Sequence, residues 1–150
     1  MKKKIIKLLS IMTLAMTSTA GWASWNSCPS LDGLTWGGIL TNTQNSVQHM
    51  PVLFTIESSH LVVGPPEPAS FYSITGNIAT DGTNADMSSA SECEQKTGNN
   101  NQQMISISIY ANNNFLYTNA PQGVVAGVNS MAVTLQANDG SYYSGTVTLQ

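Results

Sequence analysis

The sequence predicts an all-β fold, either an antiparallel β-sandwich or a closed meander barrel, with about eight short strands and one disulfide. Three observations support this prediction. Apolar and polar residues alternate in several short segments, turn-forming residues separate those segments, and two cysteines follow a segment that resembles an export signal. The pattern does not distinguish a sandwich from a barrel.

The first 23 residues have the composition of a secretory signal peptide. Lysines near the start precede an apolar run, and Gly21 and Ala23 supply the small residues that cleavage requires; cleavage after Ala20 is the alternative. The apolar run is about nine residues, whereas a membrane-spanning helix takes about 20. We therefore expect a signal peptide over residues 1–23 and a single β domain over residues 24–150.

Removal of this signal would leave a strongly acidic chain. Lys96 is then the only basic residue besides histidine, and it stands against eight Asp and Glu residues, which gives a net charge of −7. Proteins bind nucleic acids through clustered Lys and Arg that neutralise phosphates. We expect no nucleic-acid partner and no insertion into a membrane after the signal is removed.

The two cysteines, Cys28 and Cys93, are expected to form one disulfide, because a lone pair in an exported protein is usually oxidised. Two buried free thiols are the alternative. The expected location is secreted or periplasmic. A folded, disulfide-bonded intermediate would suit a two-step export route such as type II secretion.

Alternation with a period of two marks the clearest strands, at residues 104–110, 131–136 and 142–150. In the first of these, Ile105, Ile107 and Ile109 face one way and polar residues face the other. Less regular strands are expected at residues 35–41, 52–57, 60–63, 71–80 and 115–118. The segment 85–95 is the one expected short helix.

Residues that favour tight turns separate these segments. The separators are residues 42–45, 64–68, 81–82, 98–101, 112–114 and 138–140. The last of them, Asn138-Asp139-Gly140, predicts a C-terminal hairpin, because these residue types tolerate a positive φ.

The sequence offers little material for catalysis or for binding a metal. His49 and His60 lack the spacing of a zinc site, and Glu92 and Glu94 would share a face only in a strand. Residues 81–86 are rich in side-chain oxygens, so a calcium site is the alternative there to a simple turn. We expect no catalytic residue, no metal site and no cofactor.

Two features favour a binding surface instead. The outward faces of the expected strands are polar without charge, and aromatic and amide residues gather near residue 113. Sugars have apolar C–H faces and many hydroxyls, which rings and amides contact without any charge, and tyrosine is also favoured in protein interfaces. The candidate ligand-binding residues are Tyr110, Asn112, Asn114, Tyr117 and Tyr142, with Asn113, Phe115 and Tyr143 nearby. Core packing and turn formation are the alternative explanation of these residues.

The leading functional hypothesis is a secreted bacterial binding or adhesion protein that contacts host or matrix glycans or proteins through this surface. The second is a self-assembling structural protein of the envelope or biofilm matrix, because charged residues that would protect strand edges are scarce. A small secreted hydrolase is the third, with His49 and His60 as its best candidates.

Overall fold

The computed structural model describes residues 27–62, 69–97, 103–118, 124–125 and 129–150. The expected signal peptide at residues 1–23, and the expected turns at residues 64–68 and 98–101, lie outside these ranges. One 3-10 turn, η1, is followed by ten strands. They are η1 (Cys28–Leu31), β1 (Leu34–Asn42), β2 (His49–Val62), β3 (Ala69–Thr80), β4 (Thr83–Asp86), β5 (Glu92–Thr97), β6 (Gln103–Ala111), β7 (Asn114–Thr118), β8 (Val124–Val125), β9 (Ser130–Gln136) and β10 (Tyr142–Leu149).

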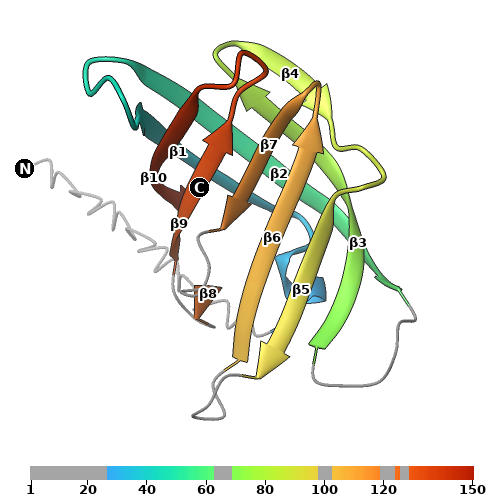
Figure 1. Cartoon of the computed structure of the whole chain (residues 1–150). Coiled ribbons are helices and arrows are strands. Elements are labelled where there is room, and N and C mark those ends of the chain that lie inside the picture. Colours follow the sequence, from blue (N-terminus) through green and yellow to red (C-terminus); the bar gives the residue numbers. More distant parts are fainter. Residues whose placement is uncertain (1–26, 63–68, 98–102, 119–123, 126–128) are drawn as a thin grey trace, which may run out of the picture.

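Eight of these strands form a closed antiparallel barrel (Figure 1). Each strand pairs with the next along the chain in the order β1, β2, β3, β5, β6, β7, β9 and β10. The barrel closes where β10 pairs with β1, with Trp36 opposite Leu149 and Asn42 opposite Tyr143. Of the two expected architectures, the closed meander barrel is the one that the chain adopts.

The side of β3 that faces away from β2 is shared by two shorter strands. Residues 69–73 pair with β5, whereas residues 77–80 pair with β4, which folds back after a tight turn. The short strand β8 adds to β6 at Met104 and Ile105. Every barrel strand therefore has a neighbour on both sides along at least part of its length, which covers most of the edges available for pairing with another chain.

The long strands β2 and β3 bend together at a bulge. Their register shifts between Ile56 and Ser58, opposite Gly76, which has a φ of 150°. A Cβ atom at residue 76 would overlap the Thr55 carbonyl oxygen, so only glycine fits this position. The segments 52–57 and 60–63, expected as two strands, are thus mostly one strand with a bulge, and residue 63 lies outside the described residues.

The barrel interior is filled by the inward-facing half of each strand. In β6 these are Ile105, Ile107 and Ile109, as the alternation predicted, and all three are buried. Other fully buried interior side chains are Trp36, Leu40, Phe54, Ile56, Leu116, Val133, Leu135 and Val147. An eight-stranded barrel is just wide enough for side chains to fill it, and burying their apolar surface is the main force that holds the strands together.

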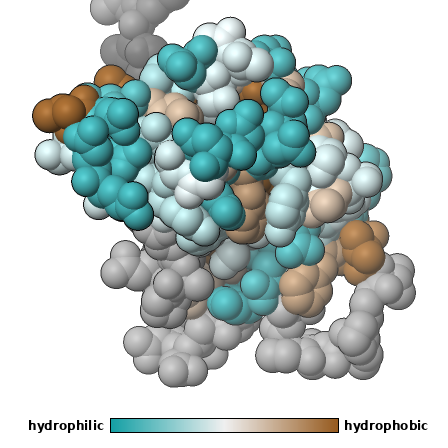
Figure 2. All heavy atoms as spheres, turned by 45° about the horizontal axis from the view of Figure 1, so that its top comes forward, coloured by the Kyte–Doolittle hydropathy of each residue, from teal (hydrophilic) through white to brown (hydrophobic). Residues whose placement is uncertain are grey.

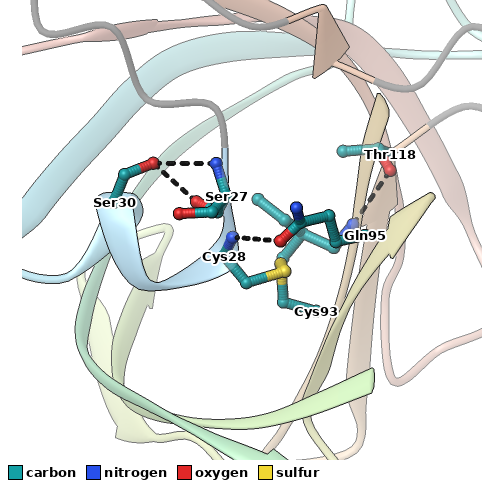
Figure 3. Close-up of a disulfide and its surroundings, with 7 residues drawn as sticks. Ser27, Cys28, Ser30, Cys93, Gln95 and Thr118 are labelled. Carbon is teal, nitrogen blue, oxygen red and sulfur yellow. Dashed lines mark hydrogen bonds between the residues drawn. A yellow bond between two sulfur atoms is a disulfide. The ribbon is translucent and has the colours of Figure 1, made fainter. Parts of the chain in front are cut away.

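The turn η1 packs into the lower part of the barrel as seen in Figure 1, against β2 and β5. Its Cys28 and Leu31 have no exposed surface. Cys28 forms a disulfide with Cys93 of β5, as expected, and its backbone N–H donates to Gln95 Oε1 at 3.3 Å (Figure 3). One covalent bond and one hydrogen bond therefore hold the start of the described chain against the inner face of β5.

Three tight turns at the other end of the barrel follow from the residues that the sequence places there. Asp81 and Gly82 join β3 to β4, and Asn112 and Asn113 join β6 to β7; all four have a positive φ. Two-residue hairpin loops with two positive φ angles match the twist of the strands, and Asn, Asp and Gly adopt them at least cost. In the turn between β9 and β10 only Gly140 has a positive φ. Mainly hydrophilic residues cover this end of the molecule (Figure 2).

The expected helix at residues 85–95 is wrong. Its first residues belong to β4 and its last to β5, with Cys93 facing inward to its disulfide partner. Local helix propensity is a weak force beside pairing with β3 and β6, which supplies backbone hydrogen bonds and buries Cys93. Within the described residues, no helix is long and apolar enough to cross a membrane.

Candidate functional site

Four outward-facing residues form a row across four neighbouring strands, close to the turn end of the barrel. Tyr110 of β6 lies opposite Phe115 of β7, Phe115 opposite Gln136 of β9, and Gln136 opposite Tyr142 of β10. The two tyrosines at the ends are 39% and 41% exposed, and the two middle residues are half-buried. We call this set the aromatic row. It places rings at both ends of a stretch of sheet and an amide between them.

The rings at the β6–β7 end stack on one another. The ring centroids of Tyr110 and Phe115 are 4.3 Å apart with an interplanar angle of 13°, and those of Phe115 and Tyr117 are 5.0 Å apart at 26°. Offset stacking of this kind is favourable beyond the area it buries. Each ring is positioned by stacking against its neighbour. The three rings therefore form an apolar surface on the outside of the barrel rather than part of its core.

The Asn112-Asn113 turn determines which rings meet. Because it contains only two residues, Ala111 pairs with Asn114 and Tyr110 therefore pairs with Phe115. The Asn114 side chain then joins this hairpin to the next one, since its Oδ1 accepts a hydrogen bond from the Asn138 backbone N–H at 3.0 Å. The two hairpins that carry the aromatic row are thus linked at their tips.

Ser91 fixes the backbone of Tyr110 from the β5 side. Its hydroxyl accepts from the Tyr110 N–H at 3.0 Å and approaches the Tyr110 carbonyl oxygen at 3.3 Å, and the residue is only 1% exposed. The backbone pairing of β5 with β6 ends at Glu92 and Ser108. The Ser91 hydrogen bonds take the place of the next backbone pair. The Ser88 N–H donates to the same carbonyl at 2.7 Å.

A surface pocket of about 410 Å³ opens beside the stacked rings. Tyr110 and Phe115 line it together with the amide-bearing residues of the β6–β7 turn. Its full lining is Ser88, Tyr110, Ala111, Asn112, Asn113, Asn114 and Phe115. None of these side chains carries a charge. Apolar rings beside a few polar groups are typical of small-molecule binding sites, and the volume lies in their range.

A second row runs parallel to the aromatic row on the same face, two residues further from the turns along each strand. Tyr117 pairs with Ser108 on one side and with Thr134 on the other, and Thr134 pairs with Ser144. The hydroxyls of Thr134 and Ser144 are 3.2 Å apart and hydrogen-bonded. These uncharged groups extend the polar part of the surface away from the pocket.

Asp139 is the acidic group in the β9–β10 turn, three residues before Tyr142. Its Oδ1 accepts from the Ser141 N–H at 2.9 Å. Hydrogen bonds from the backbone and the side chain of Ser141 hold the pKa of Asp139 below its ordinary value of 3.8. A negative charge therefore stands at this turn at neutral pH.

The structure brings together the five residues singled out from the sequence, Tyr110, Asn112, Asn114, Tyr117 and Tyr142, on one side of the barrel near its turn end. Tyr143, named with them, faces the interior and is 9% exposed. Phe115, which the sequence places in the same grouping but which is not one of these five residues, is the central ring of the stack. Gln136 and Ser88 are not among the five either. The alternation in residues 131–136 already placed Gln136 on the outer face, but only the strand register shows that it lies beside Phe115.

The other residues considered for chemistry lie apart from one another. His49 begins β2 and His60 lies near its other end, beyond the bulge, so the two side chains are far apart on the strand. Glu92 and Glu94 share the outer face of β5, and Lys96 Nζ is 3.9 Å from Glu94 Oε2. Across the described part of the chain, no three His, Cys, Asp or Glu side chains gather in a way that would hold a metal ion.

A scan against protein-family models, a search of curated proteins and a search of solved structures each returned no match for this chain.

Proposed function

We propose that this chain is a secreted binding or adhesion protein that holds a glycan against the aromatic row. The observation that carries the proposal is the stack of Tyr110, Phe115 and Tyr117 on the outer face of the barrel, beside an uncharged pocket lined by asparagines. The apolar C–H face of a sugar packs against an aromatic ring, while Asn side chains donate to and accept from its hydroxyls. Neither contact requires a charged residue.

The exposure of Tyr110 supports a binding role for these rings rather than a role in core packing. The barrel interior is occupied by other side chains, and Tyr110 keeps 39% of its surface exposed. Tyrosine rings that are pre-positioned by their neighbours lose little conformational entropy when a ligand is bound. The disulfide fits an oxidising compartment outside the cytoplasm, where a binding protein of this kind would meet extracellular glycans.

A glycan array tests the proposal with protein purified after expression and export of the full chain. Tyr110→Ala is expected to lose at least about tenfold in affinity for the glycans that the wild-type protein binds. Phe71→Ala is the control, because Phe71 is 41% exposed on β3, two strands from β6, and belongs neither to the aromatic row nor to the lining of the pocket beside it. A wild-type protein that binds no glycan, or that captures a protein through the same tyrosine, would contradict the assignment to glycans.

Self-assembly is a second candidate, supported by a different surface. Ile39 is 67% exposed on β1 and Leu53 is 46% exposed on β2, and the exposed Pro51 pairs with Ile39. The closed barrel leaves few strand edges for assembly, so contact between outer faces is the remaining route. Light scattering across a concentration series tests this candidate. A mass that rises with concentration, and that Ile39→Ser returns to a monomer, would support it.

A further inference from the structure

We propose that the ligand is an extended, uncharged polysaccharide that lies across the strands and contacts the aromatic row at both ends. This inference rests on the proposed glycan-binding function and specifies the length and charge of the ligand. The register of β6, β7, β9 and β10 indicates the length of the ligand, and the charges at the borders of the surface indicate that it is uncharged.

The length follows from strand spacing. Phe115 and Tyr142 are both direct neighbours of Gln136, so their strands are two steps apart, which corresponds to roughly 10 Å. A single sugar unit is too small to contact both rings. A chain of several linked units that runs across the strands can stack one unit on Tyr110, the exposed end of the stack, and another on Tyr142.

The space between the rings offers the groups that such a chain needs. The Gln136 amide both donates and accepts, and the half-buried Ser144 hydroxyl lies in the neighbouring row, hydrogen-bonded to the buried Thr134. These groups are uncharged. A sugar unit above Gln136 would meet hydrogen-bonding groups while its neighbours in the chain meet rings.

The charge follows from the groups at the borders of this surface. Glu92 on β5 pairs with Ser108, which in turn pairs with Tyr117, so a carboxylate stands two strands from Tyr117 and on the strand next to that of Tyr110. Asp139 stands at the other border, in the turn that leads into β10. Lys96 is the only lysine beyond residue 7, and the chain has no arginine. The Lys96 ammonium group lies near the Glu94 carboxylate. Uronate or sulfate groups would therefore be repelled over the Debye length of about 8 Å at physiological salt.

Isothermal titration calorimetry tests both properties on protein purified after expression and export of the full chain. The probes are neutral cello-, xylo-, manno- and chito-oligosaccharides, each from disaccharide to hexasaccharide, together with polygalacturonate and alginate. For the series that binds, the affinity should rise by at least about tenfold from the disaccharide to the longest chain. The two anionic polymers should bind at least about tenfold more weakly than the neutral chains at low salt.

The variants distinguish this inference from the proposed function. Tyr142→Ala should remove the gain with chain length and leave the affinity for the disaccharide unchanged, whereas Tyr110→Ala should weaken binding at every length. Phe71→Ala should behave as wild type. Binding that depends on Tyr110 but not on Tyr142 or chain length, or that is as strong for polygalacturonate, would overturn the inference and leave the function standing. If no neutral or anionic probe binds, both fall.

Discussion

Gly38 of β1 lies so close to Thr146 of β10 that a Cβ atom at residue 38 would overlap the Thr146 carbonyl oxygen. On the facing strand, a Cβ at Gly145 would stand 3.0 Å from the Ile39 carbonyl oxygen. These glycines sit between the paired residues at the two ends of the β1–β10 ladder. The seam that closes the barrel thus depends on residues without a side chain on both strands.

Two neighbouring glycines on β1 should respond differently to alanine. Gly38→Ala should lower the free energy of unfolding by about 3 kcal/mol or more, because the obstructing atoms belong to the backbone of β10. Gly37→Ala should cost about 1 kcal/mol or less, because its nearest obstacle is Leu53 Cδ1 at 2.9 Å, on a side chain that can rotate. Urea denaturation measures both. Equal losses would show that the seam has room to adjust.

Removal of the disulfide should destabilise the protein strongly. The bond closes a loop with a sequence separation of 65, which corresponds to about 4 kcal/mol in the chain-entropy model. Cys28→Ala combined with Cys93→Ala should therefore unfold at a much lower urea concentration than the oxidised wild type. Wild-type protein treated with a reductant in urea is the control and should approach the variant. A variant with an unchanged midpoint would show that η1 packs independently of the bond.

The Ser91 hydroxyl should matter far more than its exposed neighbour. Ser91→Ala removes the buried hydroxyl that accepts from the Tyr110 N–H, which should cost about 1–3 kcal/mol of stability. Ser89→Ala, in the same loop but exposed, should change stability by no more than about 0.5 kcal/mol. Parallel urea curves compare the two. A Ser91 variant as stable as the Ser89 variant would mean that water replaces the hydroxyl.

Asp139 should contribute to acid sensitivity in a defined direction. Its pKa is lowered in the folded protein by hydrogen bonds from the Ser141 backbone and side chain. The stabilisation is therefore fully present above the ordinary value of 3.8 and is lost as the pH falls through the lower, folded-state pKa. Asp139→Asn keeps an oxygen acceptor for the Ser141 N–H but does not titrate. The variant should therefore lose less stability than the wild type when the pH falls from neutral to below the folded-state pKa of Asp139. Urea curves at neutral and acid pH compare the two proteins, and identical acid dependence would contradict the assignment.

The sequence predicted those parts of the fold that depend on neighbours along the chain. The alternation of Ile105, Ile107 and Ile109 with polar residues identified the buried face of β6, because a half-buried strand has a period of two. The turn at Asn112-Asn113 could also be predicted locally, because asparagine tolerates the positive φ that both residues adopt. The segment 85–95 was misread, because its conformation depends on pairing with β3 and β6 rather than on its own propensities.

The candidate site could be predicted only in part. Tyr110, Asn112, Asn114 and Tyr117 stand close together in the sequence, so composition alone drew attention to them. That Phe115 stacks between Tyr110 and Tyr117, and that Gln136 bridges to Tyr142, follows from strand register, which no single segment encodes. The choice between a sandwich and a barrel likewise rests on β1 pairing with β10.

The pairing of Trp36 with Leu149 joins residues 113 positions apart. Until β10 pairs with β1, one edge of β1 has no partner and the seam glycines face no opposing strand. Contacts of such long separation make a fold slow to form, because the ends of a long loop must meet before they stabilise it. Pairing of β10 with β1 on one side and β9 on the other covers the last two edges of the barrel strands.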